Sequence, residues 1–330
     1  MWKPQLICPQ HKKSDKFSVE NYRPVSHLVE IGKLVEREVN AQVVDHFISH
    51  GLFHKNLHGG IPNHSTDTAL IQLHDMFLQA AQSKKLTAAL LLDQSAAYDL
   101  LDHAILLDKL VVYNFHPNTI NWFRSYLSHR SQSVQVEAKQ SPFIRLGDFA
   151  TPQGSVLGGT LFIIYENDFP AVRLEGESVM FVDDNTDCVS REDPAQLVNS
   201  IQSEANRSCD WLRDNNMCVA GHKSKLIVVG TSALKNNQLG NEEISISVDG
   251  QQIKESPSER LLGVVINNKM TWNDHIYGDS KNPGLINQLS QRLGLLKKIS
   301  NVASKRKLRM IANGLFYSKL AYCLPLFCNV

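Results

Sequence analysis

The chain has 330 residues, of which 42% are hydrophobic and 20% are charged, and its formal net charge is +1. These fractions are typical of soluble globular proteins and exclude disorder, collagen or a coiled coil as the main architecture. No apolar run approaches the roughly 18 residues that span a bilayer, and the N-terminus lacks a signal-peptide pattern. We therefore expect an intracellular protein, in the nucleus or cytoplasm, with no membrane partner.

Charge is unevenly distributed along the chain. Residues 1–40 carry a net charge of +2, residues 41–280 carry −10, and residues 281–330 carry +9 with no acidic residue. An acidic centre with a basic end fits a protein that holds metal ions centrally and binds a polyanion at one edge. A solvated helix face would explain the basic end equally well.

Hydrophobic periodicity predicts the elements in chain order. Helices are expected over residues 31–52, 66–81, 102–113 and 118–127, from residue 193 onward, and again, with basic character, from 285 to about 322. Strands are expected over residues 86–93, 132–138, 178–182, 225–230, 244–248 and 260–266, with a hairpin after 182 and a polar loop at 236–241. This mixed order predicts an α+β body with an appended helical domain.

Carboxylates stand at the ends of two predicted strands. Asp93 follows one apolar run, and the pair Asp183-Asp184 follows another. Adjacent like charges repel unless a cation lies between them, so these side chains could hold two Mg²⁺ and support an in-line phosphoryl displacement. Ordinary turn carboxylates are the alternative.

The motifs around these carboxylates resemble those of reverse transcriptases from non-LTR (LINE-type) retrotransposons. The resembling segments are Asn21-Tyr22-Arg23-Pro24-Val25-Ser26, Leu92-Asp93 to Tyr98-Asp99, Trp122 to Leu127 with Arg130 and Gln132, Thr151-Pro152-Gln153-Gly154-Ser155, Phe181-Val182-Asp183-Asp184, Lys223-Ser224 and Leu261 to Val264. The resemblance implies a right-hand polymerase fold around an antiparallel sheet. It divides the chain into fingers at 1–85, a palm with intervening segments at 86–280, and a basic helical thumb at 281–330.

The resemblance also implies residue roles. Asp93, Asp183 and Asp184 would be the catalytic metal ligands, and Lys223 would donate a proton to departing pyrophosphate. The cofactor would be two Mg²⁺ ions, with Mn²⁺ as a substitute. His103 and His275 are expected to be structural.

Nucleotide and nucleic-acid contacts are implied for residues of the fingers and thumb. The nucleotide-binding residues would be Lys12, Lys13, Arg23, Tyr98, Gln153 and Gly154. The residues that contact nucleic acid would be Lys297, Lys298, Lys305, Arg306, Lys307 and Arg309. Without the motif, Tyr98 would be interpreted as a core aromatic, Gln153-Gly154 as a turn, and the lysines as solvated surface.

The chain is thus expected to be an RNA-directed DNA polymerase that uses an RNA template, a DNA primer and dNTPs. One departure is Ile61, which stands where the family usually has arginine; an Ile61→Arg change would be expected to raise activity. The ends of the chain suggest that it contains only the polymerase portion of such an element. These ends and Ile61 support an alternative, a weakened or inactive nucleic-acid-binding remnant.

Overall fold

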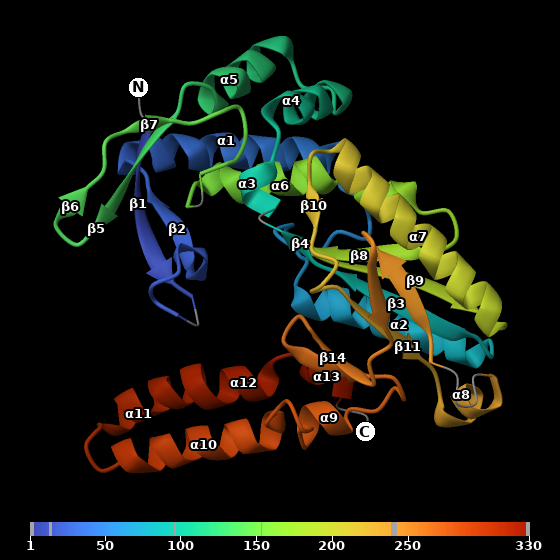
Figure 1. Ribbon diagram of the computed structural model, residues 1–330. Helices are drawn as coiled ribbons and strands as arrows, with labels where there is room; N and C mark the ends of the chain where they lie inside the picture. The colour runs from blue at the N-terminus through green and yellow to red at the C-terminus, as the bar shows by residue number, and fades with distance from the viewer. Residues whose placement is uncertain (1–2, 13–14, 96, 153, 239–242, 328–330) are drawn as a thin grey trace. The chain divides into compact units, whose positions relative to one another are not determined.

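The structure is a computed structural model that describes residues 3–12, 15–95, 97–152, 154–238 and 243–327. The helices and strands are labelled in Figure 1. By its internal contacts the chain forms two compact units. The first unit contains residues 1–61, 94–172 and 208–219, and the second contains residues 62–93, 173–207 and 220–330. The division into fingers, palm and thumb remains a prediction from the sequence.

The first unit combines a mixed sheet with helices. Its strands follow the order β2-β1-β5-β6, with β7 also paired to β5, and β1 runs parallel to β5. The strands are β1 (Pro4–His11), β2 (Tyr22–His27), β5 (Ser131–Val136), β6 (Lys139–Gln140) and β7 (Ile144–Arg145), and a separate short ladder joins β4 (Gln94–Ser95) to β10 (Cys218–Val219). The helices are η1 (Val19–Asn21), α1 (Glu30–Ser49), α3 (Ala97–Leu100), α4 (His103–Val112), α5 (Pro117–Leu127), α6 (Val156–Glu166) and η2 (Phe169–Val172).

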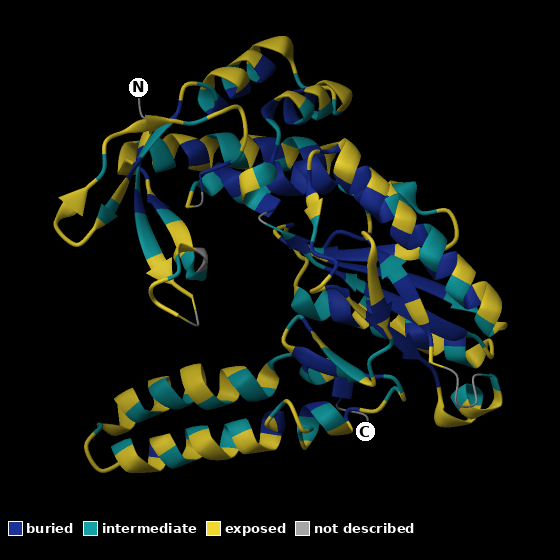
Figure 2. Cartoon of the chain, in the orientation of Figure 1, coloured by how far each residue is buried: buried dark blue, intermediate teal, exposed yellow. Residues whose placement is uncertain are grey.

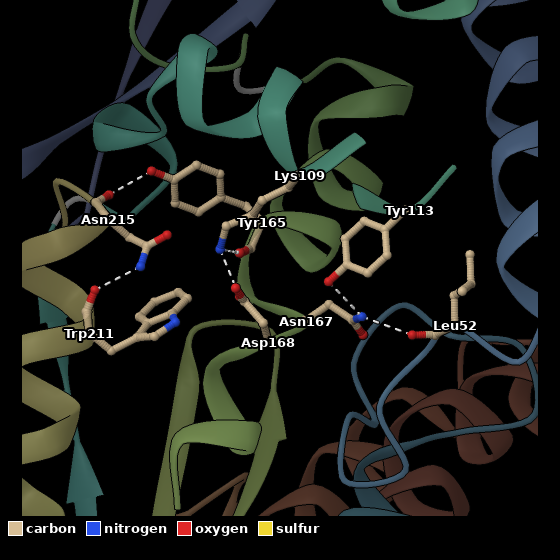
Figure 3. A network of polar contacts seen from close by, with 8 residues as sticks. All are labelled: Leu52, Lys109, Tyr113, Tyr165, Asn167, Asp168, Trp211 and Asn215. Atoms are coloured by element: carbon tan, nitrogen blue, oxygen red, sulfur yellow. Dashed lines mark hydrogen bonds and ion pairs between the residues drawn. The ribbon is translucent and has the colours of Figure 1, made fainter. Parts of the chain in front are cut away.

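A polar network holds the helices of this unit together (Figure 3). Lys109 Nζ on α4 donates to the Tyr165 carbonyl oxygen at the end of α6, at 2.5 Å, and to Asp168 Oδ1, at 2.7 Å. The ammonium group also lies 4.6 Å from the ring centroid of Trp211. Burial lowers the pKa of Lys109, and the charge of Asp168 opposes that shift. This buried cation therefore has a carboxylate partner.

The second unit is built on a four-stranded antiparallel sheet in the order β11-β3-β9-β8. Its strands are β3 (Leu86–Leu92), β8 (Glu177–Phe181), β9 (Asp184–Arg191) and β11 (Lys225–Val229). The helix α2 (Thr66–Gln82) packs on β3 and β8, and its buried face includes Leu70, Leu73 and Phe77. Strand β3 is almost wholly buried, as Figure 2 shows, which explains its continuous apolar run.

Further elements of the second unit follow the sheet. They are α8 (Ser232–Gln238), the hairpin β12 (Ser245–Val248) with β13 (Gln251–Lys254), the hairpin β14 (Ser258–Leu261) with β15 (Val264–Asn267), and the helices α9 (Asn273–Ile276), α10 (Gly284–Ile299), α11 (Lys305–Ala312), η3 (Asn313–Tyr317), α12 (Ser318–Ala321) and α13 (Leu324–Phe327). Helix α10 packs against α11, η3 and α12, and these helices are largely exposed (Figure 2). Among the described residues, no helix combines the length and apolar character needed to cross a bilayer.

The long helix α7 (Pro194–Asp214) confirms its sequence prediction in detail. Asp193 Oδ2 accepts a hydrogen bond from Gln196 N at 2.9 Å, which satisfies a free N–H group of the first turn. The apolar stripe at helical spacing on this helix is buried, and it comprises Leu197, Ile201, Ala205, Cys209 and Leu212. Residues 194–207 belong to the second unit, and the rest of the helix belongs to the first.

Two sequence predictions are wrong. Residues 260–266 are not one strand, because β14 and β15 form a hairpin whose turn residues Leu262 and Gly263 have φ values of 47° and 83°. Two consecutive positive φ values are typical of the tight hairpin turns that match strand twist, but leucine gives no sequence signal for them. Residues 236–238, expected in a loop, lie in α8, while 239–241 lie outside the described residues.

The buried imidazole of His275 should make the stability of the fold depend on pH. The side chain is 5% exposed, and its Nδ1 accepts a hydrogen bond from Val265 N at 3.3 Å. Burial, with the charges of Lys319 and Arg260, lowers the pKa of His275 to about 4. The unfolded chain therefore binds more protons between pH 6.5 and 4, so His275 stabilises the fold fully above pH 6.5 and loses this effect as the pH falls.

We expect His275 to make the free energy of unfolding decrease by up to about 3 kcal/mol as the pH falls from 7 to 4. Urea denaturation of the wild type and of His275→Asn, which keeps an acceptor near Nδ1, isolates this contribution. The variant should show a flatter pH dependence below pH 6.5. Identical slopes for the two proteins would contradict the assignment.

Ile61 lies in the core of the first unit and is 7% exposed. It follows Gly60, whose missing Cβ makes room for the side chain of Ile163. An arginine at position 61 would bury an uncompensated charge, so Ile61→Arg should destabilise the fold, while its expected effect on activity stays a prediction. We expect this change to lower the free energy of unfolding by about 3 kcal/mol or more.

The control for Ile61→Arg is Ile61→Val, which should cost only about 0.5–1.5 kcal/mol. Urea denaturation midpoints measure both effects. An arginine variant as stable as the wild type would show that this side chain can reach solvent.

Candidate active site

The carboxylates predicted from the sequence lie at one end of the central sheet of the second unit. Strand β3 pairs with β9 from Leu86↔Arg191 to Leu92↔Asn185, and the next step of this register sets Asp93 opposite Asp184. Strands β8 and β9 pair up to Phe181↔Asp184, so Asp183 lies in the two-residue turn between them. Three acidic side chains therefore come from neighbouring strand ends.

The turn between β8 and β9 is strained. Val182 has a φ of 59°, a left-handed conformation that is unfavourable for a β-branched residue. Such strain costs roughly 1–3 kcal/mol and persists only where the surrounding structure enforces it. Here the ladder of β8 with β9 fixes both ends of the turn, and Asp183 and Asp184 are exposed beside it.

The charges of these side chains act on one another. Desolvation of the Asp184 carboxyl group by nearby protein, together with the negative charges of Asp183 and Asp93, raises the pKa of Asp184 to about 6. Lys223 Nζ lies 3.7 Å from Asp93 Oδ2, and both side chains are about half exposed. The site thus concentrates negative charge, with one lysine at its margin.

The backbone of Asp93 is held on both sides by the turn that leads into β11. Asp93 N donates to Ser224 Oγ at 3.1 Å, and Ala220 N donates to the Asp93 carbonyl oxygen at 2.8 Å. Ser224 is 2% exposed, and its hydroxyl donates in turn to the Ala220 carbonyl oxygen at 3.1 Å. The Lys223-Ser224 motif gives no local signal of this positioning role, because only the fold brings residue 224 to residue 93.

The donor set of the site suits a divalent cation. Carboxylate oxygens are the ligands that Mg²⁺ prefers, and a cation would relieve the repulsion that raises the pKa of Asp184. Within the described ranges, no group of three or more His, Cys, Asp or Glu side chains is already drawn together in a metal-binding arrangement. The carboxylate groups are suitable ligands for a metal ion, but the described residues do not form a preformed metal-binding cluster.

The predicted nucleotide-binding residues belong to the first unit. Arg23 lies on β2 opposite Gln10 of β1, and Lys12 follows the end of β1, where its N–H donates to the Asn21 carbonyl oxygen at 2.8 Å. Both side chains are exposed. The structure therefore puts Lys12 and Arg23 near the same end of the β1–β2 hairpin, while Lys13 lies outside the described residues.

Tyr98 and Gly154 each make a close contact within the first unit. The Tyr98 ring stacks on Phe162, with centroids 4.5 Å apart, as expected of a core aromatic. Gly154 has a φ of 118°, and a Cβ atom there would lie 2.7 Å from the Ser26 carbonyl oxygen of β2. Glycine is thus required by the fold itself at this position. Gln153 lies outside the described residues.

The predicted nucleic-acid-binding residues lie on α10 and α11, and all of them are exposed. They are Lys297, Lys298, Lys305, Arg306, Lys307 and Arg309. Within the part of the chain that the structure describes, none of the six has an acidic partner within 4.0 Å.

The two histidines expected to be structural, His103 and His275, are buried, and His103 Nε2 is 2.8 Å from the Ala150 carbonyl oxygen.

Comparison with known proteins identifies relatives among mobile elements. The probable RNA-directed DNA polymerase from transposon X-element of Drosophila melanogaster is 26% identical over 282 residues, which cover 83% of this chain and 30% of that protein. The RNA-directed DNA polymerase from mobile element jockey of the same species is 24% identical over 291 residues, with the same coverage. The chain spans about a third of the length of these curated relatives.

Solved structures with the same fold include telomerases. Telomerase from Candida tropicalis in complex with a TWJ fragment of telomeric RNA has a TM-score of 0.57 at 12% identity, covering 99% of this chain and 54% of that chain. The apo enzyme of the same species, truncated from its C-terminal domain, has a TM-score of 0.56 at 12% identity, covering 82% and 54%. At this identity the likeness concerns the fold alone.

The family model for reverse transcriptase (RNA-dependent DNA polymerase) matches residues 10–266. This range contains the carboxylates, the lysine and the turn described above. The chain therefore belongs to the reverse transcriptase family, as a LINE-type reverse transcriptase domain with an α+β right-hand polymerase fold.

Proposed function

We propose that this chain catalyses RNA-directed DNA synthesis, adding a deoxynucleotide from a dNTP to the 3′-hydroxyl of a DNA primer on an RNA template. The observation that carries the proposal is the grouping of Asp93, Asp183 and Asp184 at the ends of paired strands, with Lys223 at 3.7 Å from Asp93. Family membership supports the same reaction class.

Asp93, Asp183 and Asp184 would hold two Mg²⁺ ions. Bound there, the ions would lower the pKa of the primer hydroxyl and stabilise the charge that develops on the phosphoryl oxygens. Lys223, with its exposed ammonium group, would hold the proton that the departing pyrophosphate takes up.

The first unit would supply nucleotide contacts. The guanidinium of Arg23 can bind phosphate oxygens through two parallel hydrogen bonds, and Lys12 or Lys13 would add a point charge. Tyr98 would pack beneath the sugar and exclude a 2′-hydroxyl group, and Gln153 and Gly154 would lie against the nascent base pair.

The alternative is a nucleic-acid-binding remnant without turnover, which the sequence suggested because Ile61 replaces the family's arginine, although Ile61 is a core residue in this structure. Primer extension on a homopolymer RNA template, with Mg²⁺ or Mn²⁺, tests the proposal directly. Extension that requires template, primer and metal would support the polymerase. Template–primer binding without extension would support the remnant.

Neutralising one candidate metal ligand should remove activity. We expect Asp93→Asn and Asp183→Asn to reduce primer extension by more than about 100-fold, because changes to residues that only support metal ligands already cost about 10- to 100-fold. The matched control is Asp108→Asn, an exposed carboxylate on α4. Activity retained by both ligand variants would contradict the assigned site.

Ser224 should act as a positioning residue for Asp93. Ser224→Ala removes the acceptor for Asp93 N–H, so we expect the Mg²⁺ concentration for half-maximal extension to rise about 10-fold or more. Mn²⁺ binding measured by calorimetry should weaken in parallel. Ser224→Thr, which keeps the hydroxyl group, should restore both. Loss of stability with unchanged metal dependence would leave Ser224 a purely structural residue.

The basic helices should bind the template–primer through phosphates. Neutralising Lys305, Arg306 and Lys307 to glutamine should reduce the slope of log K against log salt by about two to three units, because each phosphate contact contributes about 0.7–0.9. The matched control neutralises Lys55, Lys84 and Lys269, which are exposed elsewhere. An unchanged slope would mean that α11 is solvated surface.

A further inference from the structure

The first unit contains a cavity of about 330 Å³ that none of the proposed catalytic groups borders. It lies between the strands β1 and β2, the residues before β5, and the segment 146–152. Its walls include Gln5, Ile7, Pro24, Arg130, Leu146 and Phe149. Since a water molecule takes about 30 Å³ in the liquid, the cavity can hold a molecule of roughly ten non-hydrogen atoms.

Arg130 is the unusual feature of this cavity. The residue is only 4% exposed. Among the described residues, its only hydrogen bond runs from Nη1 to the Tyr126 carbonyl oxygen at 3.2 Å, and its enclosed Nε has no partner. The guanidinium also lies 5.1 Å from the Tyr126 ring centroid. A buried arginine is charged at neutral pH and is ordinarily paired, so this one lacks a counter-ion.

The acidic neighbour of Arg130 is engaged elsewhere. Glu36 is 5% exposed, and its carboxylate accepts hydrogen bonds from Tyr126 Oη at 2.8 Å, Ser155 Oγ at 3.0 Å and Val156 N at 2.8 Å. Its charge acts on Arg130, but within the described ranges no carboxylate lies within 4.0 Å of the guanidinium. Arg130 therefore keeps the capacity to bind an anion directly.

The remaining walls define the kind of ligand. Gln5 is 5% exposed, and its Oε1 has no hydrogen-bond partner in the part of the chain that the structure describes. Ile7, Leu127 and Leu146 contribute apolar surface. Asp99 also lines the cavity, but it is exposed, so solvent screens its charge, whereas Arg130 is enclosed. A buried charged donor and a few polar groups among apolar walls are typical of a site for a small molecule.

We propose that this cavity binds a compact, partly apolar molecule of roughly ten non-hydrogen atoms whose carboxylate or phosphate group pairs with Arg130. The guanidinium offers two parallel donors to such a group, and the apolar walls cover the body of the ligand. Every residue that the proposal uses belongs to the first unit and none is a proposed metal ligand, so binding can be measured without metal or nucleic acid.

Calorimetric titration of the full chain, without metal or nucleic acid, tests the proposal with four probes. Benzoate and phenyl phosphate carry the required charge and an apolar ring, benzamide is a neutral analogue of benzoate, and inorganic phosphate lacks the ring. We expect benzoate or phenyl phosphate to bind at least about 10-fold more tightly than benzamide and inorganic phosphate. Equal affinity of benzoate and benzamide, or no binding of either anion, would overturn the charged site. Inorganic phosphate that binds as tightly as phenyl phosphate would overturn the partly apolar ligand.

A variant pair assigns the binding to Arg130. Arg130→Met keeps the length of the side chain and breaks no ion pair, and it should weaken binding of the anionic probe about 10- to 150-fold. Arg124→Met, on the exposed side of α5, should leave the affinity unchanged. Unaltered affinity in Arg130→Met would overturn the proposal. If Arg130→Met does not fold, Arg130→Lys replaces it, and an affinity equal to that of the wild type would then be the overturning result.

Discussion

The pairing of β3 with β9 is the interaction on which the candidate active site depends. Seven residue pairs join these two central strands, and the side chains of β3 are almost all buried. A slip of one residue would move every side chain of β3 to the opposite face and against different neighbours, and the close packing on both buried faces disfavours this. Because the register is fixed, Asp93 is held opposite Asp184 although 91 positions separate them in the chain.

Two turns next to the sheet constrain the backbone at the carboxylates further. The turn at Val182 and Asp183 stays in an unfavourable conformation because β8 and β9 fix its ends. The turn at Ala220–Ser224 holds the backbone of Asp93 through two hydrogen bonds. These contacts keep like charges close together, which an isolated peptide would not do, and desolvation together with this repulsion raises the pKa of Asp184.

The buried cations of this protein differ in how they are compensated. Lys109 has Asp168 at 2.7 Å, and Arg173 has Asp187 and Glu204, each at 3.4 Å. Arg130 is equally buried, but among the described residues no carboxylate lies within 4.0 Å of it, and its direct contacts include the Tyr126 ring and the Tyr126 carbonyl oxygen. An uncompensated buried charge is costly. The paired cations Lys109 and Arg173 therefore fit a structural role, whereas Arg130 fits a binding site that a ligand would complete.

The sequence by itself determined the family, the α+β class and most of the elements, because periodicity, capping residues and short motifs are local properties. Ser65 caps α2, and the stripe from Leu197 to Leu212 is buried as its spacing predicts. Tertiary structure alone decided which distant groups meet. It brought Ser224 to Asp93, buried Ile61 in a core where its motif suggested a polar contact, and left Arg130 beside a cavity. These outcomes depend on packing between residues far apart in the chain, which no local pattern records.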